Sequence, residues 1–254
     1  MDQELLVFQK GFNYSQDGPG NRLVYHLQGC NMHCPWCANP EGIPARGCMM
    51  EKDKRKRLSC KTYAWDDILE EAEQSRPLFF DGGGVTFTGG EPTLQFEVLN
   101  TLLIKLKERG ISTALENNGS HPQLMKLINV VDYLMMDFKH PDGTIHKRVT
   151  GVSNEVTCGN LKAIFQSGRQ IAIRIPLING FNTSKEALNG FLEFFIGNAG
   201  KQVTFEFLRY HEYGRQKWQQ CGMEYTVSDG YVKDEDVTGF ETAFLEAGLQ
   251  VVHS

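Results

Sequence analysis

Three cysteines close together in the first part of the chain restrict its fold more than any other feature. Cys30, Cys34 and Cys37 follow the spacing C-x3-C-x2-C within the segment 29–37. Spacers this short let successive thiolates point into one cavity, where they can hold three corners of an iron–sulfur cube and leave the fourth corner open. An open coordination position is typical of catalytic metal sites. Any fold of this chain must therefore keep the loop beside a cavity.

Two other interpretations of these thiols stay open at this point. The loop also suits zinc, with His33, Cys48 or Cys60 as a fourth ligand, because soft thiolates bind both metals. Alternatively, the three cysteines are unrelated core residues. The spacing favours the iron–sulfur cluster, but spacing alone does not exclude zinc.

The composition indicates one large α/β domain over residues 1–254. The chain is 254 residues long, 41% hydrophobic and 22% charged, which suffices for a substantial single core. A net charge of −5 argues against a protein that binds nucleic acid by neutralising phosphates, and the basic run 52–57 is interpreted as a solvated loop. We expect a short irregular insert at about 42–63, with Cys48 and Cys60 as free thiols.

Apolar segments, signal-peptide features and cysteine usage indicate where the protein is located. The chain shows neither a long apolar run nor the basic and then apolar plan of a signal peptide at its start. Its seven cysteines are odd in number and unevenly spread, unlike a disulfide framework. We therefore expect a cytoplasmic protein that makes no membrane contact.

Strand and helix patterns alternate along most of the chain. Strands are expected at 5–8, 23–28, 85–88, 112–115, 133–136, 171–175 and 203–208, and a last short strand at 249–252. Helices are expected at 65–72, 99–109, 155–166, 184–196 and 241–248. Repeated strand–helix units predict a parallel sheet with right-handed crossovers, and about six units predict a partial (β/α)6 TIM-type barrel that is open on one side.

Polar residues gather just after the expected strands, where a parallel barrel places its chemistry. Gly89-Gly90-Glu91 would expose backbone carbonyls and a carboxylate suited to an ammonium group. Asp137 and Lys139 are two residues apart and so face one side, as ligand contacts or as a buried ion pair. Arg174 needs a carboxylate or a cavity because an unpaired buried charge is costly. His211 is interpreted as a ligand contact or a core histidine.

The cysteine loop resembles the cluster motif of the radical S-adenosylmethionine (SAM) enzymes. Further segments resemble the glycyl radical enzyme activases, which include the pyruvate formate-lyase activating enzymes. These segments are Asp17-Gly18-Pro19-Gly20, the run 82–91, Gly151-Val152-Ser153-Asn154, Tyr210-His211-Glu212 and Lys217-Trp218. They occur in order along nearly the whole chain.

The resemblance implies one [4Fe-4S] cluster on Cys30, Cys34 and Cys37, together with bound SAM. The implied SAM contacts are Trp36, Gly89, Gly90, Glu91, Asn117, Asp137, Lys139, Arg174 and His211. It also implies a monovalent cation at Glu116, Asn117 and Met135, although Glu116 and Asn117 stand where the family has aspartate and threonine. Many activases carry a cysteine-rich ferredoxin-like insert near residues 42–63, and two isolated cysteines predict no auxiliary cluster here.

The implied activity is reductive cleavage of SAM to a 5'-deoxyadenosyl radical, which then makes a glycyl radical on a partner such as pyruvate formate-lyase. No acid or base residue is required. The implied partner contacts are Asp17, Gly18, Pro19, Gly20, Arg22 and Trp218. The implied electron donor is a flavodoxin or a ferredoxin, and we expect a monomer. The alternatives are a radical SAM enzyme acting on a small molecule or peptide, and a non-catalytic zinc module.

Overall fold

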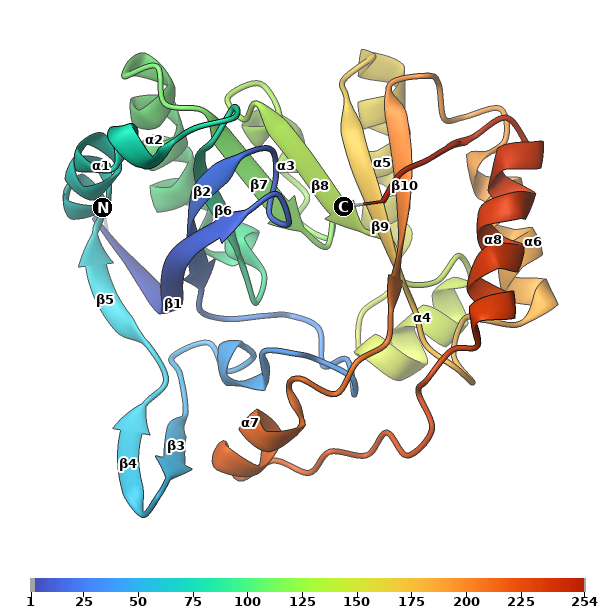
Figure 1. The fold of residues 1–254 in the computed structure, drawn as a ribbon, viewed down its shortest axis with the longest axis horizontal. Helices are drawn as coiled ribbons and strands as arrows, with labels where there is room; N and C mark the ends of the chain where they lie inside the picture. Colours follow the sequence, from blue (N-terminus) through green and yellow to red (C-terminus); the bar gives the residue numbers. More distant parts are fainter. Residues whose placement is uncertain (1–2, 254) are drawn as a thin grey trace.

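Six parallel strands form the centre of the molecule in this computed structural model, which describes residues 3–253. They lie side by side in chain order: β2 (Asn21–Leu27), β6 (Gly84–Gly89), β7 (Thr113–Asn117), β8 (Tyr133–Asp137), β9 (Ile171–Leu177) and β10 (Val203–Arg209). The expected α/β fold with six parallel units and a partial barrel is thus confirmed. Figure 1 shows β2 and β6 on the left and β9 and β10 on the right of the curved sheet.

The two edges of the nine-stranded sheet carry additional strands. β1 (Glu4–Tyr14) pairs antiparallel with β2, and β5 (Lys61–Ala64) pairs antiparallel with β1. At the other edge, β11 (Gln250–Val251) runs parallel to β10. β5 and β11 end the strand order, so the described strands do not close into a ring. The barrel keeps an open seam between β1 and β10.

Helices cover the outside of the sheet and connect successive strands. The longer helices are α1 (Trp65–Gln74), α2 (Phe96–Glu108), α5 (Glu155–Ser167), α6 (Lys185–Phe195) and α8 (Asp234–Glu246), and the shorter ones are α3 (Leu124–Leu127), α4 (Gly143–Thr150) and α7 (Arg215–Gln220). Single 3-10 turns lie at η1 (Pro40–Gly42), η2 (Arg76–Leu78) and η3 (Pro92–Gln95). Among the described residues, no helix combines the length and apolar composition needed to span a bilayer.

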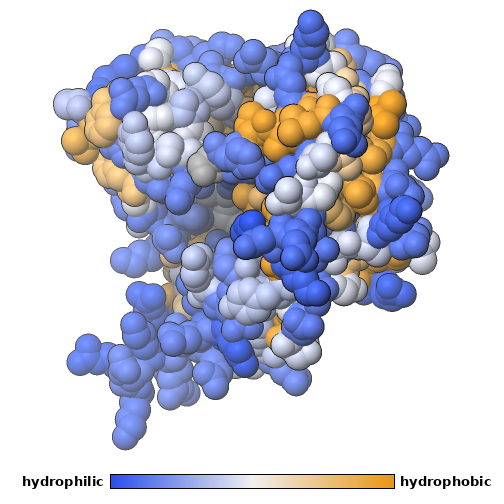
Figure 2. All heavy atoms as spheres, turned by 45° about the vertical axis from the view of Figure 1, so that its right-hand side comes forward, coloured by the Kyte–Doolittle hydropathy of each residue, from blue (hydrophilic) through white to orange (hydrophobic). Residues whose placement is uncertain are grey.

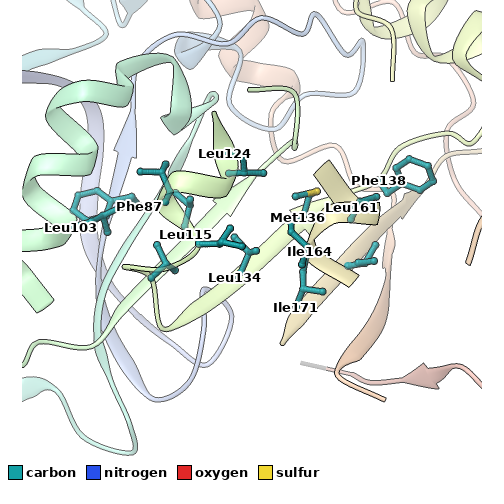
Figure 3. Close-up of a cluster of buried hydrophobic side chains, with 14 of the residues drawn as sticks. Phe87, Leu103, Leu115, Leu124, Leu134, Met136, Phe138, Leu161, Ile164 and Ile171 are labelled. Carbon is teal, nitrogen blue, oxygen red and sulfur yellow. The ribbon is translucent and has the colours of Figure 1, made fainter. Parts of the chain in front are cut away.

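The apolar core lies between the sheet and these helices. Because side chains alternate along a strand, Leu23, Tyr25 and Leu27 of β2 face the helices and belong to the buried cluster. Figure 3 shows the same arrangement further along, where Phe87 of β6 and Leu115 of β7 lie near Leu103 of α2. Because the core side chains face the helices, the side chains that alternate with them face the interior of the barrel.

The interior of the barrel is polar. The residues that alternate with the core positions include Arg22 on β2, Thr86 on β6, Glu116 on β7, Arg174 on β9 and Glu206 on β10, and all but Glu116 are buried. Buried charges need partners to be tolerated. Arg174 supplies two such pairs, with Glu116 at 2.6 Å and Glu206 at 2.9 Å. The lumen is thus a polar network, not a second apolar core.

The segment 42–63 differs from the expected irregular insert. It contains a separate two-stranded hairpin, β3 (Met49–Lys52) and β4 (Arg55–Leu58), followed by β5. The basic run is fully exposed, as expected, but it lies on a hairpin and not in a loop. Asp53 and Lys54 at its tip have φ values of 51° and 61°, which is the backbone of a tight two-residue hairpin turn. The final helix also begins earlier than expected, at Asp234.

Candidate active site

A cavity of about 270 Å³ lies at the carboxyl ends of the parallel strands. Its wall includes the three cysteines and most of the residues implied as SAM contacts: Cys30, Cys34, Cys37, Trp36, Gly89, Gly90, Asn117, Asp137, Lys139 and His211. These residues come from five separate segments of the chain. The parallel topology therefore gathers the expected site at the end of the barrel where such folds place their chemistry.

Backbone hydrogen bonds hold the cysteine loop from several sides. The Cys30 amide donates to the Ile43 carbonyl at 3.0 Å, and the His33 amide donates to the Thr150 carbonyl at 2.8 Å. The indole N–H of Trp218 donates to the Cys37 carbonyl at 2.9 Å. The loop is thereby tied to η1, to the end of α4 and to α7. The resulting fixed backbone would hold the three thiols in place for a cluster.

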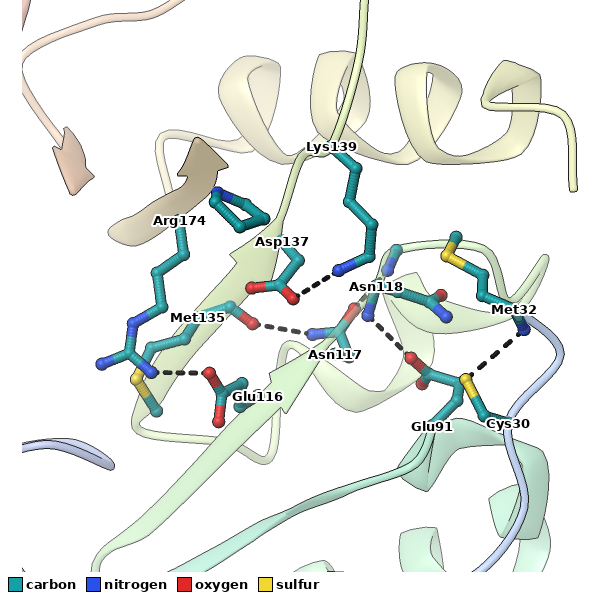
Figure 4. A network of polar contacts seen from close by, with 12 residues as sticks. Cys30, Met32, Glu91, Glu116, Asn117, Asn118, Met135, Asp137, Lys139 and Arg174 are labelled. Atoms are coloured by element: carbon teal, nitrogen blue, oxygen red, sulfur yellow. Dashed lines mark hydrogen bonds and ion pairs between the residues drawn. The ribbon is translucent and has the colours of Figure 1, made fainter. Parts of the chain in front are cut away.

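The three thiols suit a metal that prefers sulfur ligands and displaces the thiol protons when it binds. Burial is the main cause that raises the pKa of Cys30 and of Cys37 to about 12, so both thiols are protonated at neutral pH when no metal is bound. The Met32 amide lies 3.4 Å from the Cys30 sulfur (Figure 4) and would stabilise a thiolate there. Iron binding would replace the protons and satisfy the sulfurs. The donor set therefore fits the implied iron–sulfur cluster.

The two glycines of Gly89-Gly90-Glu91 permit close packing against the cysteine loop. Gly89 has a φ of 124°, which disfavours other residues. A Cβ on Gly90 would lie 2.2 Å from the Gly29 carbonyl oxygen, a severe clash. The Glu91 amide donates to that same oxygen at 2.7 Å. The motif thus joins β6 to the cysteine loop in addition to lining the cavity.

Glu91 differs from its expected role as an ammonium acceptor. Its side chain is fully buried and is absent from the cavity wall. One carboxylate oxygen accepts from the Thr93 amide at 3.0 Å, which caps η3, and the other accepts from the Asn118 amide at 2.7 Å. Both oxygens are therefore engaged. Glu91 positions the neighbouring loop, and the Gly-Gly backbone remains as the part of this motif that reaches the cavity.

Asp137 and Lys139 form an ion pair that also faces the cavity. The Lys139 ammonium lies 2.7 Å from Oδ2 of Asp137 (Figure 4). Burial lowers the pKa of Lys139, but Asp137 and the nearby thiols outweigh that effect, so its pKa is raised and the ammonium stays charged. The other oxygen, Oδ1 of Asp137, is buried without a hydrogen-bond partner. An unsatisfied buried acceptor at a cavity wall suits a ligand hydroxyl.

Arg174 lies behind the cavity wall. Its guanidinium donates to Glu116, to Glu206 and to the Gln16 carbonyl. Of these residues, only Glu116 lines the main cavity. Arg174 is therefore not part of this wall, and it orients Glu116, which is. Glu206 was not identified from the sequence, because nothing in its strand pattern distinguishes an inward glutamate from a solvent-facing one.

The expected cation ligands are already engaged with hydrogen-bond donors. Glu116 accepts from Arg174 at 2.6 Å and from the Thr88 hydroxyl at 2.7 Å. The Asn117 amide donates to the Met135 carbonyl at 3.0 Å (Figure 4), while its oxygen accepts from the Gly119 amide at 2.9 Å. The Asn117 N–H thus lies against the carbonyl that a cation would use. These residues do not fit a monovalent cation.

Trp36 and His211 flank the outer part of the cavity. Trp36 packs against Phe181 with ring centroids 4.7 Å apart, and His211 stacks on Tyr213 at 4.2 Å. Burial lowers the pKa of His211, so its ring is neutral at pH 7. Two flat faces and a neutral imidazole suit an aromatic ligand group. The carboxamide of Asn118, which also lines this cavity, was not among the residues expected from the sequence.

The loop Asp17-Gly18-Pro19-Gly20 folds beneath the barrel, at the amino ends of the parallel strands. The Thr86 hydroxyl donates to the Asp17 carbonyl at 2.7 Å. Arg22 is fully buried, and its guanidinium donates to Thr86 at 2.7 Å and to the Val85 carbonyl at 2.8 Å. Arg22 therefore anchors this loop, and its expected contact with a partner protein is not possible in this fold.

Trp218 likewise has an internal role. It is 9% exposed and donates to the cysteine loop, so the expected partner contact is corrected to support of that loop. The adjacent Lys217 bonds Asn39 at 2.8 Å and Glu41 at 2.7 Å, which fastens α7 to the segment after Cys37. These bonds could not be predicted from the sequence because their partners are far apart in the chain.

A second hollow of about 690 Å³ continues from the cavity to the open seam of the barrel. The two share Ala38, Asn39, Glu116, Leu208, Arg209 and His211. Asp17 lines the inner part of this hollow, while Phe12 and Tyr213, 45% and 83% exposed, lie on opposite sides of it. The hollow is therefore a route by which a chain segment could reach the cavity wall.

Comparisons with known proteins agree with this site. Residues 24–192 match the family model of the radical SAM superfamily. The chain is 30% identical to the 4-hydroxyphenylacetate decarboxylase activating enzyme of Clostridioides difficile (strain 630), over 97% of this chain and 95% of that protein. It is 32% identical to the pyruvate formate-lyase-activating enzyme of Streptococcus mutans, over 84% and 80% respectively.

A solved structure gives the same result for the fold. A domain of the pyruvate-formate lyase-activating enzyme from Bacteroides vulgatus superposes with a TM-score of 0.55 and 25% identity, covering 67% of this chain and 98% of that one. The family match and the relatives make a non-catalytic zinc module untenable. The chain belongs to the radical SAM superfamily and, within it, to the glycyl radical enzyme activating enzymes.

Proposed function

We propose that this protein activates a partner enzyme by generating a glycyl radical on it. The observation that carries the proposal is that the three cysteines and the Asp137–Lys139 pair line one cavity, which continues into the open seam. When bound, a reduced [4Fe-4S] cluster and SAM supply the chemistry, in which one electron cleaves SAM to methionine and a 5'-deoxyadenosyl radical. Hydrogen abstraction from a glycine by this radical needs no acid or base residue.

Different residues of the cavity would bind different groups of SAM. Lys139, whose ammonium stays charged, would bind the carboxylate, and the free oxygen of Asp137 would accept from a ribose hydroxyl. Backbone groups of Gly89 and Gly90 would face the amino group. Trp36 and His211 would flank the adenosine portion. Four contacts at separate points would fix both the position and the direction of the reactive carbon.

The second hollow would receive the glycine-bearing segment of the partner. An extended segment entering between Phe12 and Tyr213 would pass Asp17 and reach the wall formed by Glu116 and His211. Seating of that segment would also exclude water from the cavity. Gly18, Pro19 and Gly20 shape the loop that carries Asp17, and Arg22 donates to the Pro19 carbonyl of this loop. Partner contact in this region thus rests on Asp17, not on Arg22.

The site works without a monovalent cation in this proposal. The Asn117 amide donates to the Met135 carbonyl, so this carbonyl already has a hydrogen-bond donor in place of a cation. This hydrogen bond also joins the ends of β7 and β8 beside Asp137. The consequence is that SAM binding would not depend on the identity of the alkali ion in the buffer.

The remaining expectations concern partners and location. The protein would act as a monomer, as one radical SAM domain, in the cytoplasm, and would take its electron from a flavodoxin or a ferredoxin. Pyruvate formate-lyase or a related glycyl radical enzyme would be the protein substrate. Relatives are named for three different partner enzymes, namely 4-hydroxyphenylacetate decarboxylase, choline trimethylamine-lyase and pyruvate formate-lyase.

An anaerobic assay tests the proposal. The chain is reconstituted with iron and sulfide, reduced with dithionite and mixed with SAM, and 5'-deoxyadenosine is measured with and without each of the three partner classes. Electron spin resonance then reports a glycyl radical. We expect deoxyadenosine and a radical on one partner. Deoxyadenosine with a modified peptide or small molecule in place of a radical would instead support the alternative substrate class, and no deoxyadenosine would refute SAM chemistry.

A further inference from the structure

The hairpin β3–β4 carries charge opposite to that of the rest of the chain. Residues 52–57 contain five cationic side chains and one aspartate, so this run is +4 while the whole chain is −5. The remainder of the chain is therefore −9. All six residues of the run are exposed, and the hairpin forms the hydrophilic arm that projects at the lower left in Figure 2. An acidic molecule would be repelled by the body and attracted to this arm.

The cations of the hairpin are not used by the fold. Within residues 3–253, the only ion pair on this run is Lys56 with Glu51, at 3.6 Å. Lys52 lies directly across from Arg55 in the hairpin register, a like-charge pair that destabilises the strands. A hairpin outside the main sheet is also only marginally stable. These charges therefore lower stability, and a bound anionic surface would relieve that repulsion.

The base of the hairpin is bonded to η1, which follows the cysteine loop. The Ser59 hydroxyl accepts from the Cys48 amide at 3.0 Å and lies 3.3 Å from the Glu41 carbonyl. The side chain of Gln28, the residue just before the cysteine segment, donates to that same carbonyl at 2.8 Å. The arm thus has a fixed direction relative to the cluster position.

A groove of about 670 Å³ separates the hairpin from α7. Its walls include Lys52 and Lys56 together with Glu51 and Asp53 on the hairpin, and Gln216 and Gln220 on the helix, so the excess positive charge lies on the outer side of the hairpin and not in the groove. The same helix carries Trp218, whose N–H donates to the Cys37 carbonyl. A protein seated on the groove would therefore be separated from a cluster ligand by a single short helix and one indole ring.

We propose that the hairpin and the groove beside α7 dock an acidic one-electron carrier protein, with reduced flavin or an iron–sulfur centre as its redox group. The inference rests on the proposed function, since the cluster must gain one electron for each SAM cleaved and the carrier loses that electron. The glycine-bearing partner enters elsewhere, at the open seam. Steering by opposite charge mainly raises the association rate and is weakened by salt.

The test separates delivery of electrons from the chemistry that uses them. The variant Lys52→Gln, Arg55→Gln, Arg57→Gln removes three unpaired cations of the hairpin. A matched control, Lys126→Gln, Lys185→Gln, Lys201→Gln, removes three exposed cations from other surfaces. Deoxyadenosine formation is measured with a reduced acidic flavodoxin and, separately, with dithionite, and flavodoxin binding is measured directly by fluorescence anisotropy.

For the hairpin variant we expect at least a tenfold loss of the flavodoxin-driven rate and of flavodoxin affinity at low salt, with the dithionite-driven rate unchanged. The control variant should match the wild type. Unchanged flavodoxin affinity in the hairpin variant would overturn the docking site, and so would an equal loss with dithionite. A loss confined to the glycyl radical yield under dithionite would assign the arm to the glycyl radical enzyme instead. Failure of the proposed function would appear separately, as no deoxyadenosine from the wild type with dithionite.

Discussion

The two faces of the parallel sheet have opposite characters. The outer face buries side chains such as Phe87, Leu115 and Phe205 against the helices. The inner face carries the pair Asp137 and Lys139 and the ionic group of Arg174 with its two glutamates. The fold is thus stabilised mainly on one side of the strands, which leaves the other side available for ligand binding. Substitutions on the inner face should therefore mainly affect function, and substitutions on the outer face should mainly affect stability.

The largest functional loss should come from the cysteine loop, with little loss of stability. Cys34→Ala removes one thiolate of the expected cluster site and leaves the core between sheet and helices untouched. We expect no visible iron–sulfur absorbance after reconstitution and no deoxyadenosine, with a far-ultraviolet circular dichroism spectrum like that of the wild type. Cys158→Ala, a thiol outside the cavity wall, serves as the control. A full cluster in Cys34→Ala would contradict the assignment.

Arg174 tests the limit of this division between the faces, because it lies on the inner face and the stability of the fold also depends on it. Arg174→Leu leaves Glu116 and Glu206 without their cation, and breaking a buried pair in this way costs about 3–5 kcal/mol. Chemical denaturation measures the loss. Adding Glu206→Leu removes one of the two carboxylates that have lost Arg174 and should restore part of the stability. Wild-type stability of Arg174→Leu would show that the network contributes nothing.

On the outer face, Phe205→Ala should lower stability by about 3–5 kcal/mol through the cavity it creates. Phe205 is fully buried against Phe195 and Phe244, with ring centroids 4.7 and 5.1 Å away. Its neighbour Thr204 points to the other face, so Thr204→Ala should change stability far less. SAM affinity of folded Phe205→Ala, measured well below its melting temperature, should stay near the wild-type value. A similar loss from both substitutions would contradict the division between the faces.

The smallest effect is expected at Asn117. Asn117→Ala removes the N–H from the Met135 carbonyl, a buried hydrogen bond whose loss costs about 1–3 kcal/mol. In the wild type, replacing potassium with tetramethylammonium should leave SAM affinity unchanged. In Asn117→Thr, the freed carbonyl and a hydroxyl could admit a cation, so potassium should tighten SAM binding. Potassium dependence in the wild type would refute the replacement of a cation by the amide.

The strand pattern predicted most of the fold because it reflects local alternation and short connections. The six parallel strands lie within a few residues of their expected bounds. The hairpin β3–β4 was missed because its strands are charged and exposed, with Met50 as the only buried residue, so they lack the apolar alternation of a half-buried strand.

The site was less predictable than the fold. The sequence placed Cys30, Asp137 and His211 among the functional residues, and the structure brings them to one cavity. It gave misleading roles to Glu91 and Arg22, both of which are fully buried. Proximity to a motif does not show whether a polar side chain faces a ligand or bonds a backbone amide. That choice depends on segments distant in sequence, such as Asn118 for Glu91.

The sequence by itself determined the cysteine spacing, the order of the strands and the positions of the residues that follow them, because these depend on local geometry and chain order. Only the tertiary structure decided which carboxylates remain free. Arg174 on β9 reaches Glu116 on β7, beyond β8, and Glu206 on β10, and the Asn117 amide reaches Met135 on the next strand. Buried polar groups bond whichever partner folding places beside them, and chain order alone does not specify those partners.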